Sequence, residues 1–280
     1  MHEPLPGPTI HPPRGELPVL ASVPHAGRDY PQWLLDMSRG GRRTLQALED
    51  PLVDRLVWRA MSHGLGAVIA RAPRAAVDCN RAEDEIDPAI IRESSIPRRA
   101  TVRTRGGLGI VPARTAAHGN LWRHGIGGAD LEKRLSEVHR PYHGAITEAL
   151  DAFLARFGCA LLLDCHSMPP PAGCQASVVF GDRCGRSAAP WVISQACKIA
   201  EERGFPAAAN DPFAGGHVIE RHGSPELGIH ALQIEVDRRC YLTAAGEPNE
   251  GFDDVAQLIE AVALQLGQAL LDQQLPQAAE

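Results

Sequence analysis

Long hydrophobic runs are missing from this 280-residue sequence. No apolar stretch approaches the ~20 residues that a membrane-spanning helix needs. The first four residues, Met1-His2-Glu3-Pro4, lack the basic segment and following hydrophobic segment that are typical of a secretory signal. These absences predict a cytoplasmic protein that does not associate with a membrane.

Cysteine pairs and stacking aromatics are also scarce. The seven cysteines include no Cys-x-x-Cys pair, so the sequence indicates neither a disulfide framework nor a zinc knuckle, and we expect reduced thiols. An arginine-rich stretch between Glu83 and Gly125 contains no Phe, Tyr or Trp before Trp122. It therefore offers no platform on which nucleic-acid bases could stack, and we expect no nucleic-acid partner.

The composition is that of a globular protein, because 44% of the residues are hydrophobic. Residues 1–15 contain five prolines and predict an extended lead-in. Residues 16–280 are expected to form a single domain. The stretch between residues 83 and 125 is poor in periodic apolar residues and rich in Arg, Gly and Pro, which predicts a solvated active-site loop.

Hydrophobic periodicity predicts alternating strands and helices. Strands are expected at residues 17–23, 67–70, 75–78, 160–163, 177–180 and 231–236. Helices are expected at 130–157, with a kink at Pro141, and at 188–203 and 253–273. This order favours an α/β fold with three layers, α/β/α, in which helices cover a central mixed sheet.

Two of the predicted strands run directly into a histidine. The apolar run 160–163 is followed by Asp164-Cys165-His166-Ser167, and the strand at 17–23 is followed by Pro24-His25-Ala26-Gly27. Open α/β sheets carry their chemistry at the carboxyl ends of strands. His25 and His166 therefore suggest one metal ion, and an open catalytic zinc site would add a third protein ligand, such as a carboxylate.

Asp50 is a candidate for that carboxylate. The pair Asp50-Pro51 is also typical of a helix N-cap with proline in the first turn, and apolar residues at helical spacing follow it. Asp54, one helical turn further on, is an alternative ligand. On the last predicted strand, Glu235 alternates with apolar neighbours and is either a general base or an ordinary exposed strand residue.

Six segments in order resemble the N-formylglutamate amidohydrolase family, which is related in fold to the zinc carboxypeptidases and aspartoacylases. The segments span residues 22–27, 77–81, 140–144, 163–167, 213–217 and 231–236. The resemblance covers the chain from about residue 17 to residue 242. It implies a zinc-carboxypeptidase-like (phosphorylase/hydrolase-like) α/β fold and zinc-dependent hydrolysis of an amide.

The resemblance also implies roles for the residues that match the family's motifs. His25, Asp50 and His166 match the positions that hold one zinc ion, although this ligand set would also suit another divalent metal. Glu235 matches the general base. Asn80 and Arg81 match a pair that grips a substrate carboxylate.

Further residues are candidates for substrate binding. Arg74 is a second guanidinium that could pair with a carboxylate, although arginines in a loop are more often simply solvated. Gly215 and Gly216 would allow the backbone to approach the site closely, and a plain turn explains them equally well. Family members commonly carry an arginine shortly after this pair, where this chain has Glu220, so the accepted substrate could differ.

The expected function is release of an N-acyl group, most simply formyl, from an acidic amino acid such as glutamate. Its partner would be a small anionic amino-acid derivative. The alternatives are a related N-acyl amino acid deacylase or γ-glutamyl-type peptidase, and a non-catalytic protein that binds metal and ligand. His139 and His143, four residues apart on one predicted helix, form either a second metal pair or a structural pair at the kink.

Overall fold

The structure is a computed structural model and describes residues 3–170, 173 and 175–274. The chain packs as two compact units. The single domain expected at residues 16–280 stays a prediction. The first unit comprises residues 1–9, 24–49 and 69–144, and the second comprises 10–23, 50–68 and 145–280. Both units are discontinuous along the sequence.

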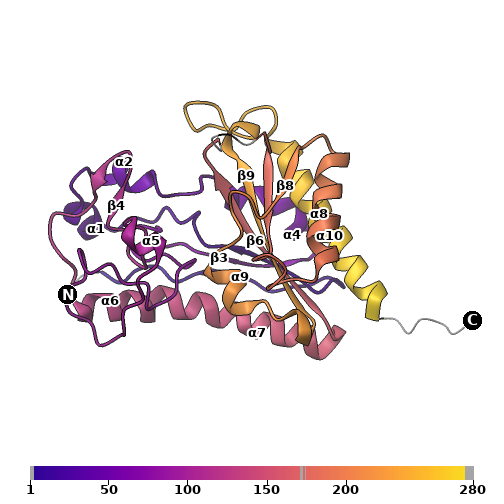
Figure 1. The fold of residues 1–280 in the computed structure, drawn as a ribbon, viewed down its shortest axis with the longest axis horizontal. Helices are drawn as coiled ribbons and strands as arrows, with labels where there is room; N and C mark the ends of the chain where they lie inside the picture. Colours follow the sequence, from indigo (N-terminus) through magenta and orange to yellow (C-terminus); the bar gives the residue numbers. More distant parts are fainter. Residues whose placement is uncertain (1–2, 171–172, 174, 275–280) are drawn as a thin grey trace, which may run out of the picture. The chain divides into compact units, whose positions relative to one another are not determined.

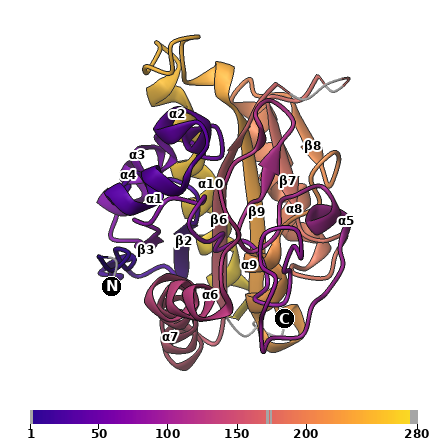
Figure 2. The ribbon, with the colours of Figure 1, turned by 90° about the vertical axis from the view of Figure 1, so that its left-hand side faces the viewer.

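A seven-stranded mixed sheet is the centre of the second unit. In sequence order its strands are β1 (Thr9–His11), β2 (Val19–Val23), β3 (Gly66–Ile69), β6 (Ala160–Met168), β7 (Val178–Gly181), β8 (Ala207–Ala209) and β9 (Ile229–Asp237). Their spatial order is β1-β3-β2-β6-β9-β7-β8, and Figure 2 shows the central strands side by side. Strand β6 is parallel to both β2 and β9, and β7 is antiparallel to β9.

Helices cover this sheet, as the pattern of apolar residues predicted. Helix α10 (Phe252–Gln274) packs against α8 (Pro190–Glu202), α4 (Trp58–Ser62) and β6, and Figure 1 shows α8 and α10 alongside each other. Gly267 of α10 lies so close to β2 that an added Cβ would come within 2.6 Å of the Val19 side chain. The predicted α/β fold with helices over a mixed sheet is confirmed.

The shorter helices of the second unit carry or border residues discussed below. They are α3 (Val53–Leu56), α9 (His217–His222), and the 3-10 turns η2 (Pro225–Leu227) and η3 (Arg238–Cys240). Helix α7 (Arg140–Phe157) begins in the first unit and ends in the second.

The first unit is built from short elements and connecting segments. Its helices are α1 (Gln32–Met37), α2 (Gly41–Gln46), α5 (Val102–Arg105) and α6 (Gly128–Arg134), and β4 (Arg114–Thr115) pairs with β5 (Gly119–Asn120). The stretch predicted as a solvated loop is folded, because Ile86, Ile91, Ile110 and Trp122 are buried. Isoleucines without helical or strand periodicity gave no signal of this packing.

The predicted kink at Pro141 takes the form of a π-helical segment, η1 (Leu135–His139), between α6 and α7. Proline lacks the N–H of an ordinary helical residue and clashes with the preceding turn. A wider turn before Pro141 relieves that conflict, since the amide of Arg140 bonds to the carbonyl of Leu135, five residues earlier.

Two local predictions were wrong, and one segment is more ordered than expected. Residues 75–78 do not form a strand: 75 and 76 lie in a turn, in which the Ala76 amide bonds to the Pro73 carbonyl, and 77 and 78 have no regular secondary structure. No helix begins at Asp50, because Leu52 has a left-handed backbone with φ of 61° and α3 starts after it. Within the proline-rich segment 1–15, β1 joins the edge of the sheet.

The remaining expectations concern membranes and thiols. Within residues 3–170, 173 and 175–274, no helix is both long and apolar enough to cross a membrane. The six cysteines in the described part of the chain are free thiols, and Cys174 lies outside it.

Candidate active site

Two neighbouring strands of the second unit carry polar side chains on one face of the sheet. In the parallel register of β6 and β9, Asp164 is the partner of Gln233 and His166 is the partner of Glu235. Side chains alternate between faces along a strand, so these four residues share a face. Val19 and its partner Leu161 lie on the opposite face, where α10 packs.

His166 is held between two carboxylates. Its Nε2 donates to Asp164 Oδ2 at 2.9 Å, and its Nδ1 lies 2.9 Å from Asp50 Oδ2. Asp164 also accepts a hydrogen bond of 2.7 Å from the hydroxyl of Ser22 on β2. The imidazole ring orientation is therefore fixed from the Nε2 side, which leaves Nδ1 directed at Asp50.

The electrostatics around His166 favour a positive charge. Burial opposes that charge, but Asp164, Asp50 and Glu235 outweigh the burial and raise the pKa of His166 well above its usual range. Neutral imidazole and carboxylate oxygens are also the donors that zinc and related divalent metals prefer. The buried Asp50 and His166 thus form a His/Asp group that fits a metal ion.

Asp50 is engaged by tertiary contacts and does not cap a helix. Besides its contact with His166, its Oδ1 accepts from Arg238 Nη2 at 3.1 Å. Arg238 also donates from Nε to the hydroxyl of Ser167 at 3.2 Å, so it ties Asp50 to the end of β6. Asp54, the alternative ligand, lies in α3. Sequence reasoning missed Arg238, because one more charged residue after a strand carries no distinguishing signal.

Glu235 is partly exposed and is oriented by its own strand. Gln233 Nε2 donates to Glu235 Oε1 at 2.9 Å, and the two side chains lie on the same face, two residues apart. The Glu235 carboxylate also contributes to the raised pKa of His166. Glu235 is therefore a partly buried carboxylate that is held on the polar face of the sheet, and its role as a general base stays a prediction.

In the first unit, the buried carboxylate of Asp78 collects several predicted site residues. His25 Nε2 donates to Asp78 Oδ1 at 2.7 Å, and Arg74 Nε donates to Asp78 Oδ2 at 2.8 Å. The backbone N–H of Asn80 also donates to Asp78 Oδ1, at 2.8 Å. Burial would raise the pKa of Asp78, but Arg74, His25 and Arg81 hold it well below its usual range.

Asp78 therefore binds the imidazole of His25 in the same way that Asp164 binds the imidazole of His166. Each aspartate accepts a hydrogen bond from the Nε2 of its histidine, which fixes the orientation of the imidazole ring. The sequence analysis noted Asp164, two residues before His166, but missed Asp78, which lies 53 residues beyond His25. Only the fold brings that pair together.

Arg81 is buried and anchored. Its Nε donates to the carbonyl of Leu108 at 2.8 Å, and its Nη1 donates to the carbonyl of Asn80 at 2.6 Å. Burial lowers the pKa of Arg81 to about 10, so its guanidinium is still charged at neutral pH. Arg74, in contrast, uses its Nε to donate a hydrogen bond to the Asp78 carboxylate.

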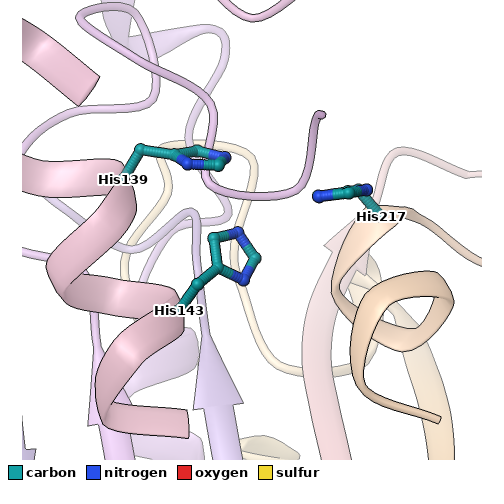
Figure 3. Close-up of side chains that lie close together, drawn as sticks. All are labelled: His139, His143 and His217. Atoms are coloured by element: carbon teal, nitrogen blue, oxygen red, sulfur yellow. The ribbon is translucent and has the colours of Figure 1, made fainter. Parts of the chain in front are cut away.

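His139 and His143 support the same segment. They lie one helical turn apart, with ring centroids 4.5 Å apart, and Figure 3 shows both rings projecting from the same side of the helix. Their Nε2 atoms donate to the carbonyls of Arg81 and Cys79, at 2.8 and 2.9 Å. These bonds support a structural role, because they fix the backbone on either side of Asn80. The two histidines also belong to a group that could hold a metal ion, so the second-metal interpretation stays a prediction.

The Gly-Gly segment and Glu220 lie in the second unit. Gly215 has φ of 124°, and an added Cβ would come within 2.2 Å of the Ile219 side chain, so the backbone requires glycine there. Gly216 immediately precedes α9. Glu220 of α9 accepts a hydrogen bond of 2.6 Å from Arg183. An ion pair therefore occupies the position where an arginine was expected from the resemblance.

Known proteins resemble this chain over nearly its whole length. A model of the N-formylglutamate amidohydrolase family matches residues 17–242. The N-formylglutamate deformylase of Pseudomonas putida is 30% identical over 266 residues, which cover 92% of this chain and 94% of that protein.

Solved structures agree with these sequence matches. The crystal structure of N-formylglutamate amidohydrolase from Ralstonia eutropha JMP134 is similar with a TM-score of 0.87 and 30% identity, covering 94% of this chain and 98% of that one. The gene product Atu2144 of Agrobacterium tumefaciens has a similar fold, with a TM-score of 0.68 and 19% identity over 96% of this chain and 94% of that one.

Proposed function

The chain belongs to the N-formylglutamate amidohydrolase family, and we propose on that basis that it hydrolyses N-formyl-L-glutamate to formate and L-glutamate. The observation that carries the proposal is the pairing of His166 with Glu235 on adjacent strands, beside the carboxylate of Asp50. It combines a metal-binding group with a proton acceptor, and metal-assisted amide hydrolysis needs both.

We propose His25, Asp50 and His166 as the ligands of one zinc ion. The chain's connectivity supports the inclusion of His25. Ser22 on β2 is the parallel partner of Asp164 on β6, so both strands end at the same edge of the sheet. His25 follows Ser22 by three residues, and His166 follows Asp164 by two.

A bound zinc ion would lower the pKa of a water molecule to about 7 and polarise the formyl carbonyl. Glu235 accepts a proton from the attacking water and passes it to the amine of the departing glutamate. Gln233 orients the Glu235 carboxylate for this transfer through a hydrogen bond to Oε1. Asp164 and Asp78 keep both histidine rings in the tautomer that presents Nδ1.

Arg81 and Asn80 are proposed to bind a carboxylate of the substrate. The bonds from Arg81 Nε and Nη1 to backbone carbonyls hold the guanidinium plane, and Nη2 remains for an incoming oxygen. His139 and His143 position this segment. Arg74 contributes positive charge while paired with Asp78. Gly215 and Gly216 would allow the substrate to pass close to the backbone.

Formate release from N-formyl-L-glutamate tests the proposal, with zinc-loaded protein and a chelator-treated sample compared side by side. We expect zinc-dependent formate at an enzymatic rate. Full activity in metal-free protein would overturn the assignment of a metal-dependent mechanism.

The same assay separates the two alternatives. Turnover of N-acetyl or γ-glutamyl substrates, without turnover of the formyl compound, would identify a related deacylase or peptidase whose pocket differs around Glu220 and Arg183. Binding of N-formyl-L-glutamate with no product from any substrate would identify a non-catalytic binding protein.

A further inference from the structure

A pocket of about 700 Å³ lies within the first unit, and it contains none of the residues assigned to the hydrolytic site. Its charged lining consists of Arg39, Arg92, Glu93 and Arg123. Three arginines and one glutamate thus line the pocket, in a chain whose net charge is -6. Such a local excess of positive charge on a negative protein is a feature that the proposed hydrolysis does not use.

Two of these arginines are held by a reciprocal arrangement. Ser38 and Trp122 form an antiparallel bridge, closed by backbone bonds from Arg39 to Leu121 and from Arg123 to Met37. Across the bridge, Arg39 Nε donates to the Trp122 carbonyl at 2.7 Å, and Arg123 Nε donates to the Ser38 carbonyl at 3.0 Å.

This arrangement pre-organises the two guanidinium groups. Each is fixed through Nε, and the bonds across the bridge do not use its terminal Nη nitrogens. A guanidinium fork matches the paired oxygens of a carboxylate or a phosphate. Because the side chains are already held, an anion that binds them pays less of the usual ordering entropy.

The rest of the lining defines what kind of anion would fit. Ile90, Ala113 and Ile126 line the pocket and are each less than 9% exposed, so part of the wall is apolar. The indole N–H of Trp122 bonds to the Pro112 carbonyl and is not available to a ligand. An inorganic ion would leave this apolar wall uncovered.

We propose that this pocket binds a small organic anion with two negative charges and a short apolar body. Arg39 and Arg123 would bind one acidic group, and Arg92 would supply the additional positive charge. Glu93 opposes binding by like-charge repulsion. None of the residues proposed for hydrolysis lines this pocket, so the inference does not rest on the proposed function.

Isothermal titration calorimetry with two rigid probes, benzene-1,3-dicarboxylate and phenyl phosphate, tests the proposal on the metal-loaded full chain. The two probes distinguish a carboxylate from a phosphate preference. We expect the double variant Arg39→Gln/Arg123→Gln to bind the preferred probe about tenfold more weakly than wild type, since each hydrogen bond to a charged group is lost. The matched control is Arg43→Gln, which removes an exposed arginine of α2 outside the pocket.

Arg92→Gln and Glu93→Gln keep the test valid if the double variant does not fold, because neither side chain holds the Ser38–Trp122 bridge. We expect binding about threefold weaker in Arg92→Gln and about threefold tighter in Glu93→Gln, since surface charges contribute little each. Affinities within twofold of Arg43→Gln for all the pocket variants, or no binding of either probe at millimolar concentration, would overturn the proposal.

Discussion

Glu235 lies directly opposite His166 in the parallel register of β9 and β6, on the face of the sheet that also carries Asp164 and Gln233. A hydrogen bond from Gln233 orients the glutamate, and a hydrogen bond to Asp164 orients the histidine. The proposed general base and a proposed metal ligand are therefore positioned by the same pair of strands.

Replacing Glu235 by glutamine should greatly slow turnover and preserve the shape of the side chain. We expect Glu235→Gln to lower kcat for formate release about 100-fold or more, because glutamine cannot accept the proton. The matched control is Glu226→Gln, an exposed glutamate of η2, which should retain wild-type activity. A Glu235→Gln enzyme within tenfold of wild type would assign the proton transfer to another group.

Zinc should stabilise the folded chain through its ligands. At a free zinc concentration 100 times the dissociation constant, we expect the free energy of unfolding in urea to rise by about 2.7 kcal/mol, and a chelator should reverse the change. Asp50→Asn should remove most of this zinc-dependent increase, and Asp54→Asn should keep it. The opposite result for the two variants would identify Asp54 as the ligand.

Among the carboxylates of the first unit, we expect the removal of Asp78 to lower the free energy of unfolding most. Asp78→Asn would leave Arg74 and the buried Arg81 without their common counter-charge, and we expect a loss of about 3–5 kcal/mol in urea unfolding. The control Asp36→Asn removes an exposed charge on α1, where the carboxylate accepts from Gln32, and should cost no more than about 0.5 kcal/mol.

The lowered pKa of Asp78 also predicts how the difference in unfolding free energy between wild type and Asp78→Asn depends on pH. A carboxyl group with a lower pKa in the folded state stabilises the protein above its unfolded pKa of about 3.9. That stabilisation is lost as the pH falls through the folded pKa. The difference between wild type and Asp78→Asn should therefore be constant near neutral pH and shrink only in strong acid. A difference that shrinks between pH 8 and pH 6 would contradict the assigned pKa shift.

Glu83 should show a similar dependence on a smaller scale. The nearby His139, whose Nδ1 lies 3.6 Å from Glu83 Oε1, and the hydrogen bonds from Arg140 lower the pKa of Glu83 from 4.5 to about 2. Its contribution to stability should be complete above pH 4.5 and disappear as the pH falls toward 2. Urea unfolding of Glu83→Gln and wild type, compared at pH 6 and pH 3 in metal-free protein, checks this. Glu148→Gln, on the exposed side of α7, serves as the control.

The sequence could indicate the strand ends that carry the site, because apolar runs followed by Asp164-Cys165-His166 and by His25 are local patterns. The role of Asp50 was not accessible in this way. Asp50-Pro51 is a typical helix start, but the contacts of Asp50 with His166 and Arg238 are tertiary, and Leu52 adopts a left-handed backbone. Tertiary contacts override local propensity here.

The segment 75–78 is a second place where tertiary contacts override the local structure that the sequence predicts. Ala75-Ala76-Val77 has the composition of a buried strand, and all three residues are buried. The backbone nevertheless turns, and the amide of Asp78 bonds to the carbonyl of Ile110. Burial could be predicted from these residues, whereas the turn that aims Asp78 at His25 depends on a partner more than thirty residues away.

The alternation of side chains along β6 and β9 has a consequence for protein engineering. Because the four polar side chains of these strands share one face, a single-residue insertion or deletion within either strand would turn its polar pair toward α10 and its apolar residues toward the proposed site. Libraries that aim to change the accepted acyl group should therefore vary loop lengths and side chains freely, and leave the lengths of these two strands untouched.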